Sequence, residues 1–292
     1  WGRTYKDIFQ RFKAMQGFDQ RFQNGFDCQG LWLEVETEKE LGFNSKKDIE
    51  GYGLANFSKA CRARVERFSK IQTEQSIKLG QWMDWNNSYY TMSDEYIEAI
   101  WYFLKKCHEK GWLYKGTKVL PWCNRCGTSS SKHEMSDEGY SEMTHLSIYI
   151  KAKIKNKSNE YLLLWTTTEW TLSSNIAAAV NPGIDYIKAQ QDGNIYYLAK
   201  SLESKLGSNY KILRTIKGKD LLGLEYESFY PDFEIQKRVV HKVVFWDEVT
   251  EKEGTGIVHI APTCGEEDYI LAKKENLQIL SPVLDEFGNY NV

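Results

Sequence analysis

Several common features are scarce in this chain, and each scarcity excludes a class of protein. No apolar run approaches the roughly 20 residues of a membrane-spanning helix, so we expect no membrane association. The six cysteines are few for 292 residues and indicate a reduced cytoplasmic protein rather than a disulfide scaffold. The net charge of −2 leaves no basic excess, so any contact with nucleic acid must depend on local patches.

Several sequence motifs are absent as well. The chain has no Gly-x-x-x-x-Gly-Lys-Ser/Thr loop, no Gly-x-Gly-x-x-Gly at a strand–helix junction and no Gly-x-Ser-x-Gly elbow. P-loop, dinucleotide-binding and serine-hydrolase functions are therefore excluded. The sequence does not begin with methionine, so it gives no basis for judging a targeting signal.

Aromatic residues, in contrast, are abundant: they make up 14% of the chain and include 10 Trp and 18 Tyr. Rings in this number can fill a large core and still leave several for ligand contacts. The 41% hydrophobic and 27% charged residues are typical of a globular protein and exclude a long disordered chain. The length suits one large domain or two of ordinary size.

The first half of the chain has helical patterns. Apolar residues at helical spacing predict helices over residues 5–15 and 47–79. A third helix is expected to begin after Ser93, a favourable N-cap, and to end near Gly111. We expect the apolar residues of this third helix to be buried, namely Tyr96, Ile97, Ile100, Trp101, Phe103, Leu104 and Cys107.

After about residue 143 the pattern changes to strands. Residues 185–190 and 195–199 flank Asp192-Gly193, a strong hairpin signal. Further strands are predicted over residues 145–154, 161–168, 238–246 and 254–260. We therefore predict an α/β protein with a mostly helical domain, residues 1–145, followed by a β-rich domain, residues 146–292.

Two cysteines form a Cys-x-x-Cys pair, Cys123 and Cys126. The short loop between them lets both thiolates face one metal, which makes half of a tetrahedral zinc knuckle. The chain has no second pair, and His133 is a candidate third ligand. Free structural thiols are the alternative; a redox pair is less favoured because no βαβ pattern surrounds it.

A carboxylate, Asp27, lies in a loop between Gly25 and Gly30. Glycine permits close backbone approach, so this carboxylate could pair with a cationic group of a ligand. The alternative is a solvated aspartate in a turn.

Three threonines, Thr166, Thr167 and Thr168, end an apolar run and are bracketed by Trp165 and Trp170. Their hydroxyls would form the polar edge of an apolar pocket. The alternative is a run that reflects only the strand propensity of threonine.

His259 and Asp268 stand at opposite ends of a turn that contains Pro262 and Gly265. An imidazole and a carboxylate placed in this way predict a binding or hydrolytic site. The alternative is that both residues are structural.

Taken together and in their order along the chain, these segments resemble the isoleucyl-tRNA synthetases, a family of class I aminoacyl-tRNA synthetases. Residues 25–30 resemble its amino-acid-binding loop, and the Cys-x-x-Cys pair resembles half of the zinc knuckle at the root of its editing domain. Residues 165–175 and 254–269 resemble the two signature stretches of that editing (CP1) domain. The Trp-Thr-Thr-Thr-x-Trp-Thr-Leu form is closer to the isoleucyl than to the valyl or leucyl relatives.

The resemblance implies part of a Rossmann-type catalytic domain with half of a zinc knuckle in residues 1–145. It implies a β-barrel-like editing domain, incomplete at its C-terminal end, in residues 146–292. The full enzyme would charge tRNA(Ile) with isoleucine, using ATP and Mg²⁺, and would hydrolyse mischarged valyl-tRNA(Ile). Its partners would be tRNA(Ile), isoleucine, valine and ATP, and it would be a cytoplasmic monomer with Zn²⁺ only at the half-site.

The resemblance also implies roles for single residues. Asp268 would hold the α-ammonium of valine, the threonines would position substrate and water, and His259 would shape the side-chain end of the pocket. The implied catalytic set for editing is Asp268, Thr166, Thr167, Thr168 and His259. The implied substrate-binding set is Asp27 and Gln29 for isoleucine, and Asn175 and Trp170 in the editing pocket. The implied metal ligands are Cys123 and Cys126.

The sequence departs from the family pattern at several positions. Glu169 stands where Pro is usual, Gln29 where His is common, and Trp32 where Pro is frequent. The His-x-Gly-His and Lys-Met-Ser-Lys-Ser signatures for ATP are absent, so we expect an internal segment that does not activate isoleucine by itself. Alternative assignments are a valyl or leucyl relative, a non-catalytic tRNA-binding fragment and a free-standing trans-editing deacylase.

Overall fold

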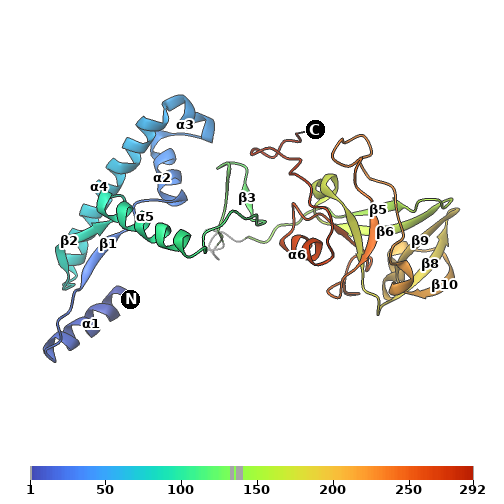
Figure 1. Cartoon of the computed structure of the whole chain (residues 1–292), viewed down its shortest axis with the longest axis horizontal. Coiled ribbons are helices and arrows are strands. Elements are labelled where there is room, and N and C mark those ends of the chain that lie inside the picture. The colour runs from blue at the N-terminus through green and yellow to red at the C-terminus, as the bar shows by residue number, and fades with distance from the viewer. Residues whose placement is uncertain (1, 132–134, 136–140, 292) are drawn as a thin grey trace. The chain divides into compact units, whose positions relative to one another are not determined.

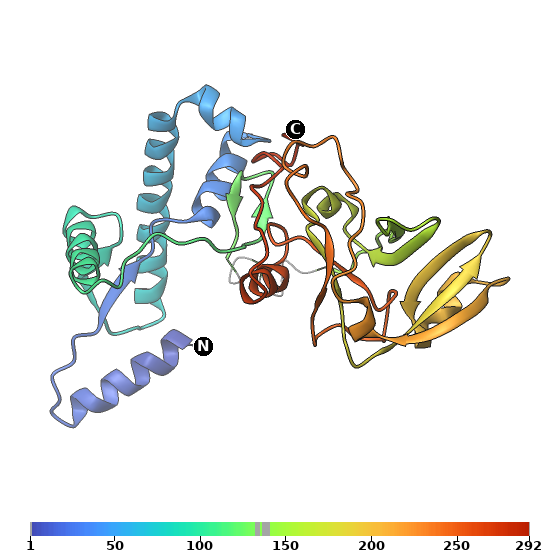
Figure 2. The same cartoon turned by 45° about the vertical axis from the view of Figure 1, so that its right-hand side comes forward.

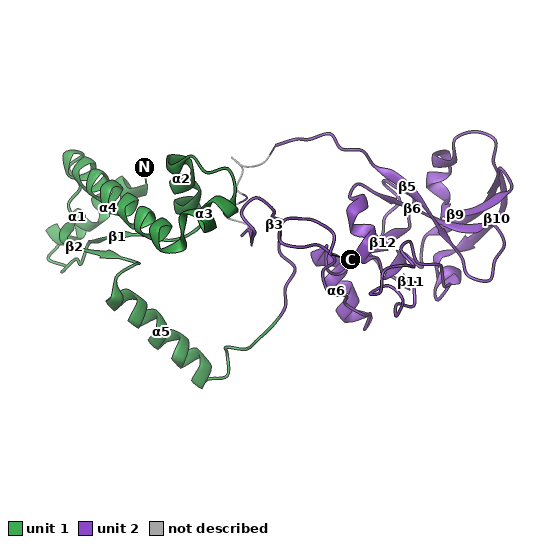
Figure 3. Cartoon of the chain, turned by 90° about the horizontal axis from the view of Figure 1, so that it is seen from above, with its two compact units in different colours: residues 1–116 green, residues 117–292 purple. Residues whose placement is uncertain are grey.

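The computed structural model describes residues 2–131, 135 and 141–291. The chain separates into two compact units, Trp1–Gly116 (unit 1) and Thr117–Val292 (unit 2), which are coloured separately in Figure 3. The mixture of helices and sheets agrees with the predicted α/β class. No helix in the described part of the chain combines the length and apolarity needed to cross a bilayer.

Unit 1 is built on two short parallel strands joined by helices. Strand β1 (Gln23–Phe26) pairs with β2 (Asp84–Tyr90), and the register places Phe26 opposite Tyr90. Parallel strands require a long crossover connection. Here the crossover consists of α2 (Leu31–Leu41), α3 (Lys46–Tyr52) and α4 (Leu54–Lys78). Helix α1 (Gly2–Met15) precedes β1, and α5 (Asp94–Glu109) follows β2 (Figure 1).

Local signals set the boundaries of these helices. Ser93 caps α5 as predicted, since its Oγ accepts a hydrogen bond of 3.3 Å from the Tyr96 N–H. Asp48 caps α3 by accepting the N–H groups of Asn44 and Ser45. The single helix predicted over residues 47–79 is wrong. It is divided into α3 and α4 at Gly53, whose φ of 93° is not helical.

The apolar face of α5 is exposed, contrary to the prediction. No residue of α5 is buried; Trp101 is 67% exposed and Phe103 is 61% exposed. The periodicity of a sequence shows which side of a helix is apolar, whereas the cover for that side must come from another element. Tyr96, Leu104 and Cys107 are half-buried, and the Tyr96 ring stacks on Tyr89 of β2, but no described element of unit 1 buries the whole face.

Unit 2 contains two larger sheets and a small hairpin. The five-stranded sheet has the order β10-β8-β9-β6-β5, and the three-stranded sheet has the order β11-β7-β12. Figures 1 and 2 show the strands of the first sheet, β5, β6, β8, β9 and β10, as neighbours. The strands of the first sheet are β5 (Ile148–Lys153), β6 (Glu160–Thr166), β8 (Asp185–Gln191), β9 (Asn194–Ala199) and β10 (Lys211–Lys217). Those of the second are β7 (Ala177–Val180), β11 (Lys242–Phe245) and β12 (Val258–Ile260).

Short helical turns and one helix complete unit 2. The 3₁₀ turn η2 (Glu169–Ser174) follows β6 directly, and helix α6 (Glu266–Lys274) follows β12 after a short loop. Two further turns are η3 (Lys200–Leu206) and η4 (Gly218–Leu221). Strands β3 (Trp122–Cys123) and β4 (Thr128–Ser129) form the small hairpin.

The core of unit 2 lies between its two larger sheets. Its largest buried cluster joins Leu162 and Leu164 of β6 to Ala178 and Val180 of β7. All four residues of β7 are buried, because β7 is the central strand of its sheet. The second sheet is therefore packed against β6 through β7.

The predicted hairpin at Asp192-Gly193 is confirmed. Strands β8 and β9 pair antiparallel up to Gln191 and Asn194, and the two turn residues have φ of 49° and 78°. Two positive φ angles in a two-residue loop match the right-handed twist of the strands. The strand predicted over residues 254–260 is shorter, because Gly254 and Gly256 adopt positive φ and form turns before β12.

The β3–β4 hairpin with its two cysteines belongs to unit 2, whereas we expected it in the first domain. Compact units reflect packing, and packing alone does not define a catalytic or an editing domain. The division at residues 145 and 146 therefore stays a prediction.

Candidate active site

The predicted threonines lie at the end of β6 and at the start of η2. Thr166 is buried, and its Oγ1 accepts a hydrogen bond of 3.1 Å from the Thr168 N–H. The Thr166 and Thr168 hydroxyls are 3.3 Å apart. Thr167 and Thr168 are exposed. The threonine hydroxyls thus shape the turn that leaves the strand, as short polar side chains often do.

His259 lies on β12 and reaches η2. Its Nε2 is 3.0 Å from Oγ1 of Thr171, and the residue is only 8% exposed. Burial disfavours the charged imidazolium and lowers the pKa of His259 to about 4. The ring is therefore neutral at physiological pH.

Asp268 lies in the first turn of α6, beyond the loop that follows β12. Its Oδ2 accepts a hydrogen bond of 2.8 Å from the Ala261 N–H, and no other described residue donates to this carboxylate. Burial raises the pKa of Asp268; the Ala261 N–H opposes this shift, and the neighbouring Glu267 carboxylate adds to it. Ala261 is two residues after His259 in the chain. Its hydrogen bond therefore orients the Asp268 carboxylate close to the end of β12.

Asn175 lies beneath this site and is almost completely buried. Its Oδ1 accepts a hydrogen bond of 2.7 Å from the Tyr226 hydroxyl, and its Nδ2 donates to the Ala177 carbonyl at 2.9 Å. Its own carbonyl accepts hydrogen bonds from Gln236 and His241. The structure thus uses both polar atoms of the Asn175 side chain inside the protein, where they hold the end of η2 to β7 and to Tyr226.

Trp170 and Glu169 lie on the outer side of η2, and both are exposed. The Trp170 carbonyl accepts hydrogen bonds from Ser173 Oγ at 2.9 Å and from the Tyr290 hydroxyl at 3.2 Å. Glu169 is the first residue of η2, a position that suits Pro in a helical turn and also suits an acidic side chain. The departure at Glu169 is therefore compatible with the local backbone.

Within the predicted editing set, Thr166 and Thr168 are in hydrogen-bond contact, whereas His259 and Asp268 each contact residues outside the set. The Thr171–His259 contact joins η2 to β12, and the Asp268–Ala261 bond joins α6 to the end of β12. Among the described residues, no hydrogen bond joins Asp268 to the threonines. Four residues that contact the site were not among the predicted site residues: Thr171, Tyr226, Gln236 and His241. Thr171 lies within the quoted tryptophan–threonine motif, but its partner is 88 positions away.

Asp27 of unit 1 lies where β1 ends. The carboxyl ends of parallel strands meet at one edge, so Asp27 lies close to Thr91, which directly follows β2. The Thr91 hydroxyl accepts a hydrogen bond of 2.8 Å from the Cys28 N–H. The same hydroxyl lies 3.5 Å from Asp27 Oδ1. Gln29 donates through Nε2 to the Thr91 carbonyl at 3.3 Å. Asp27 and Gln29 are both exposed, so the carboxylate remains accessible to a cationic ligand.

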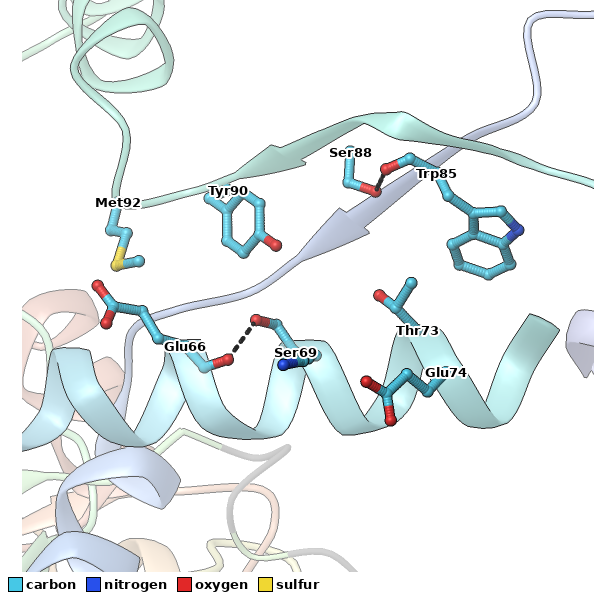
Figure 4. Close-up of a pocket in the computed structure, with 9 residues that line it drawn as sticks. Glu66, Ser69, Thr73, Glu74, Trp85, Ser88, Tyr90 and Met92 are labelled. Atoms are coloured by element: carbon cyan, nitrogen blue, oxygen red, sulfur yellow. Dashed lines mark hydrogen bonds between the residues drawn. The ribbon is translucent and has the colours of Figure 1, made fainter. Parts of the chain in front are cut away.

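A groove of about 530 Å³ lies between α4 and β2 in the same unit. Figure 4 shows side chains of α4 on one wall, and side chains of β2 together with Met92 on the other. The Ser69 hydroxyl donates to the Glu66 carbonyl, and the Ser88 hydroxyl donates to the Trp85 carbonyl. These hydroxyls serve the protein itself, and no predicted site residue lines the groove, so we assign no ligand to it.

Cys123 and Cys126 lie on the β3–β4 hairpin and are partly buried. No group of three or more His, Cys, Asp or Glu side chains suited to a metal occurs among the described residues. His133, the candidate third ligand, lies outside the described residues. Two thiolates do not complete the four-ligand set of a structural zinc site.

Comparisons with known proteins identify similar sequences along nearly the whole chain. The family described as "tRNA synthetases class I (I, L, M and V)" matches residues 1–255. Isoleucine–tRNA ligase 2 of Bacillus cereus (strain ZK / E33L) is 42% identical over 290 residues, which cover 99% of this chain and 28% of the relative. The isoleucine–tRNA ligase of Clostridium tetani (strain Massachusetts / E88) is 40% identical, with 99% and 28% covered. The chain thus spans little more than a quarter of the length of these curated relatives.

Among solved structures, the editing domain of the P. falciparum cytosolic leucyl-tRNA synthetase (space group P1) overlaps with a TM-score of 0.35 at 20% identity. The overlap covers 44% of this chain and 57% of that chain. This structural similarity is too low to support an argument.

Proposed function

The chain belongs to the class I tRNA synthetases of the I, L, M and V group, and on that basis we propose that it is part of an isoleucine–tRNA ligase. The observation that carries this proposal is the identity of 42% and 40% to two isoleucine–tRNA ligases along 99% of the chain. The complete enzyme would use ATP and Mg²⁺ to join isoleucine to tRNA(Ile) in the cytoplasm, as a monomer. Cys123 and Cys126 would supply two of the ligands for Zn²⁺.

In this proposal, Asp27 of unit 1 binds the ammonium group of isoleucine. Its exposure and the fixed backbone of the following residues, Cys28 and Gln29, support such a role. A carboxylate and an ammonium form a charge-assisted hydrogen bond, which is stronger than a neutral one.

Unit 2 would supply the editing reaction, the hydrolysis of valyl-tRNA(Ile). In this enzyme family, the one methylene that separates valine from isoleucine is known to be worth only about 1–3 kcal/mol, so a second site must remove the smaller product. Water adds to the ester carbonyl, the terminal ribose hydroxyl leaves with a proton, and free valine and tRNA result.

Asp268 would hold the α-ammonium of the valyl group through the carboxylate oxygen that Ala261 leaves unbound. The exposed hydroxyls of Thr167 and Thr168 would position the ester and water, together with Thr166 behind them. His259 would close the side-chain end of the pocket as a neutral ring. Asn175 would hold the turn η2 in place through its buried side chain. Trp170, which is exposed, would contribute to the binding of substrate in the editing pocket.

The direct test is deacylation of valyl-tRNA(Ile) by the purified chain and by the Asp268→Ala variant. Loss of a charge-assisted hydrogen bond costs about 1.5–3 kcal/mol, so kcat/KM is expected to fall by at least about 10- to 100-fold. Glu267→Ala is the matched control, because it removes the neighbouring exposed carboxylate of the same helical turn. Equal rates for the wild type and Asp268→Ala would contradict the proposed role.

The same assay separates two of the three alternative functions. A valyl or leucyl relative would deacylate a different mischarged tRNA. A chain that binds tRNA and hydrolyses no ester would be a binding fragment. A free-standing trans-editing deacylase would hydrolyse valyl-tRNA(Ile) in the cell with no synthetase sequence attached. The identities to isoleucine–tRNA ligases favour the first proposal over these three.

A further inference from the structure

The hydroxyl of Thr171 has two neighbours that fix its single proton. Oγ1 lies 2.7 Å from the Thr168 carbonyl oxygen and 3.0 Å from His259 Nε2. A carbonyl oxygen only accepts hydrogen bonds, so the hydroxyl must donate its proton to Thr168. Only lone pairs of Oγ1 then remain for the histidine.

It follows that His259 Nε2 is the donor in the second contact. Because burial keeps this ring neutral, it carries one proton, and that proton is on Nε2. The other nitrogen, Nδ1, is then an unprotonated acceptor. It is buried and makes no hydrogen bond within the described part of the chain.

We propose that Thr171 is a positioning residue that fixes the tautomer and direction of the His259 ring, so that Nδ1 is held ready to accept an O–H donor of the editing reaction. The donor is a water molecule of the editing pocket. A buried acceptor without a partner is unfavourable, so a donor that reaches this atom on substrate binding is stabilised. The tautomer follows from the structure alone, whereas the role toward the ester rests on the proposed function.

The surroundings of Thr171 make the arrangement rigid. The Thr168 carbonyl accepts both the Thr171 hydroxyl and the Thr171 N–H, at 2.7 and 3.0 Å. Thr171 is itself buried within η2, and His259 is fixed in β12 by pairing with Ala178. Turning either side chain would break the Thr171–His259 contact, and turning Thr171 would also break its hydrogen bond to the Thr168 carbonyl.

The tautomer can be observed directly by long-range ¹H–¹⁵N correlation on the whole chain labelled with ¹⁵N-histidine. His259→Gln identifies the signals of His259 among the five histidines. Near pH 7 we expect a protonated Nε2 and an unprotonated Nδ1 in the wild type and in Thr171→Ser, which retains the hydroxyl. Thr171→Val keeps the shape and removes the acceptor, so a mixture of tautomers is expected. A protonated Nδ1 in the wild type, or unchanged signals in Thr171→Val, would overturn the proposal.

Deacylation of valyl-tRNA(Ile) tests the role toward the ester. We expect kcat to fall about tenfold or more in Thr171→Val with little change in KM, and rescue to within a few-fold in Thr171→Ser. If the wild type is active and Thr171→Val is equally active, the positioning role is wrong and the proposed function stands. If the expected tautomer is observed in an inactive wild type, the proposed function is wrong, and the role of Nδ1 toward the ester is wrong with it.

Discussion

At the scale of single residues, burial acts on the two ionisable groups of the candidate site in opposite directions. It lowers the pKa of His259 and raises the pKa of Asp268, because burial disfavours the charged form of each group. The hydrogen bond from the Ala261 N–H opposes the shift of the carboxyl group. An ammonium group beside Asp268 would lower the pKa of this carboxyl group again, because an opposite charge nearby favours the charged form.

The low pKa of His259 predicts how stability depends on pH. The unfolded chain binds a proton at His259 near pH 6.5, whereas the folded chain binds it only near pH 4. The contribution of His259 to the unfolding free energy is therefore complete above pH 6.5. The unfolding free energy should fall by up to about 3 kcal/mol as pH decreases toward 4. Urea unfolding of the wild type and His259→Gln across this range measures the contribution as a difference. His241, whose pKa burial also lowers, is present in both proteins, so its contribution cancels in the difference. Parallel pH profiles of the two proteins would contradict the prediction.

At the scale of elements, the turn before β12 depends on a glycine. Gly256 has φ of 73°, and a Cβ at this position would collide with the Cβ of Ala199 at the end of β9. The backbone here is held on both sides. The Ala199 N–H donates to the Thr255 carbonyl at 2.8 Å, and the Tyr186 hydroxyl donates to the Gly256 carbonyl at 2.7 Å. The turn joins the two sheets, so it cannot move aside to accept a side chain.

Gly256→Ala is therefore expected to destabilise the chain by about 2–5 kcal/mol, the sum of left-handed backbone strain and overpacking. Gly193→Ala in the β8–β9 hairpin is the matched control. It also has positive φ, but its Cβ would meet open space, so only about 1–2 kcal/mol is expected. Urea unfolding gives both values. Equal losses in the two variants would show that the contact with Ala199 is relieved at little cost.

Helix α5 shows what an element can and cannot reveal in isolation. Its start follows from Ser93 and the acidic residues Asp94 and Glu95, which suit the first turn of a helix. Its apolar stripe is also real, but Trp101 and Phe103 are exposed in the structure. Caps act within a few residues of backbone, whereas burial requires a second surface.

At the scale of the whole molecule, the two units differ in how much core they contain. The three buried apolar clusters of the described residues all lie in unit 2. Within the described part of unit 1, the buried hydrophobic residues are Phe26, Cys28, Ile49 and Phe57. Opening free energy rises with buried apolar contacts, so the units should open to solvent at different rates.

Hydrogen exchange on the whole chain should therefore show slow amides in β6, β7 and β8 and fast amides in α1 and α5. We expect the slow group to exchange at least about 100-fold more slowly, which corresponds to about 3 kcal/mol of additional opening free energy. Mass spectrometry of peptic peptides after deuteration measures both groups in one sample. Protection of α5 equal to that of β7 would show that its apolar face is covered in solution.

The sequence alone was sufficient for features that depend on a few neighbouring residues or on an ordered set of motifs. These include the Asp192-Gly193 hairpin, the cap at Ser93, the α/β class and the synthetase family. It also identified His259, Asp268 and the threonines as candidates, and their roles stay predictions. Only the tertiary structure decided that Thr171 meets His259, that Asn175 is enclosed by Tyr226 and Gln236, and that the α5 face is exposed. The physical reason is that such contacts depend on strand order and packing between residues far apart in the chain, which local propensity does not specify.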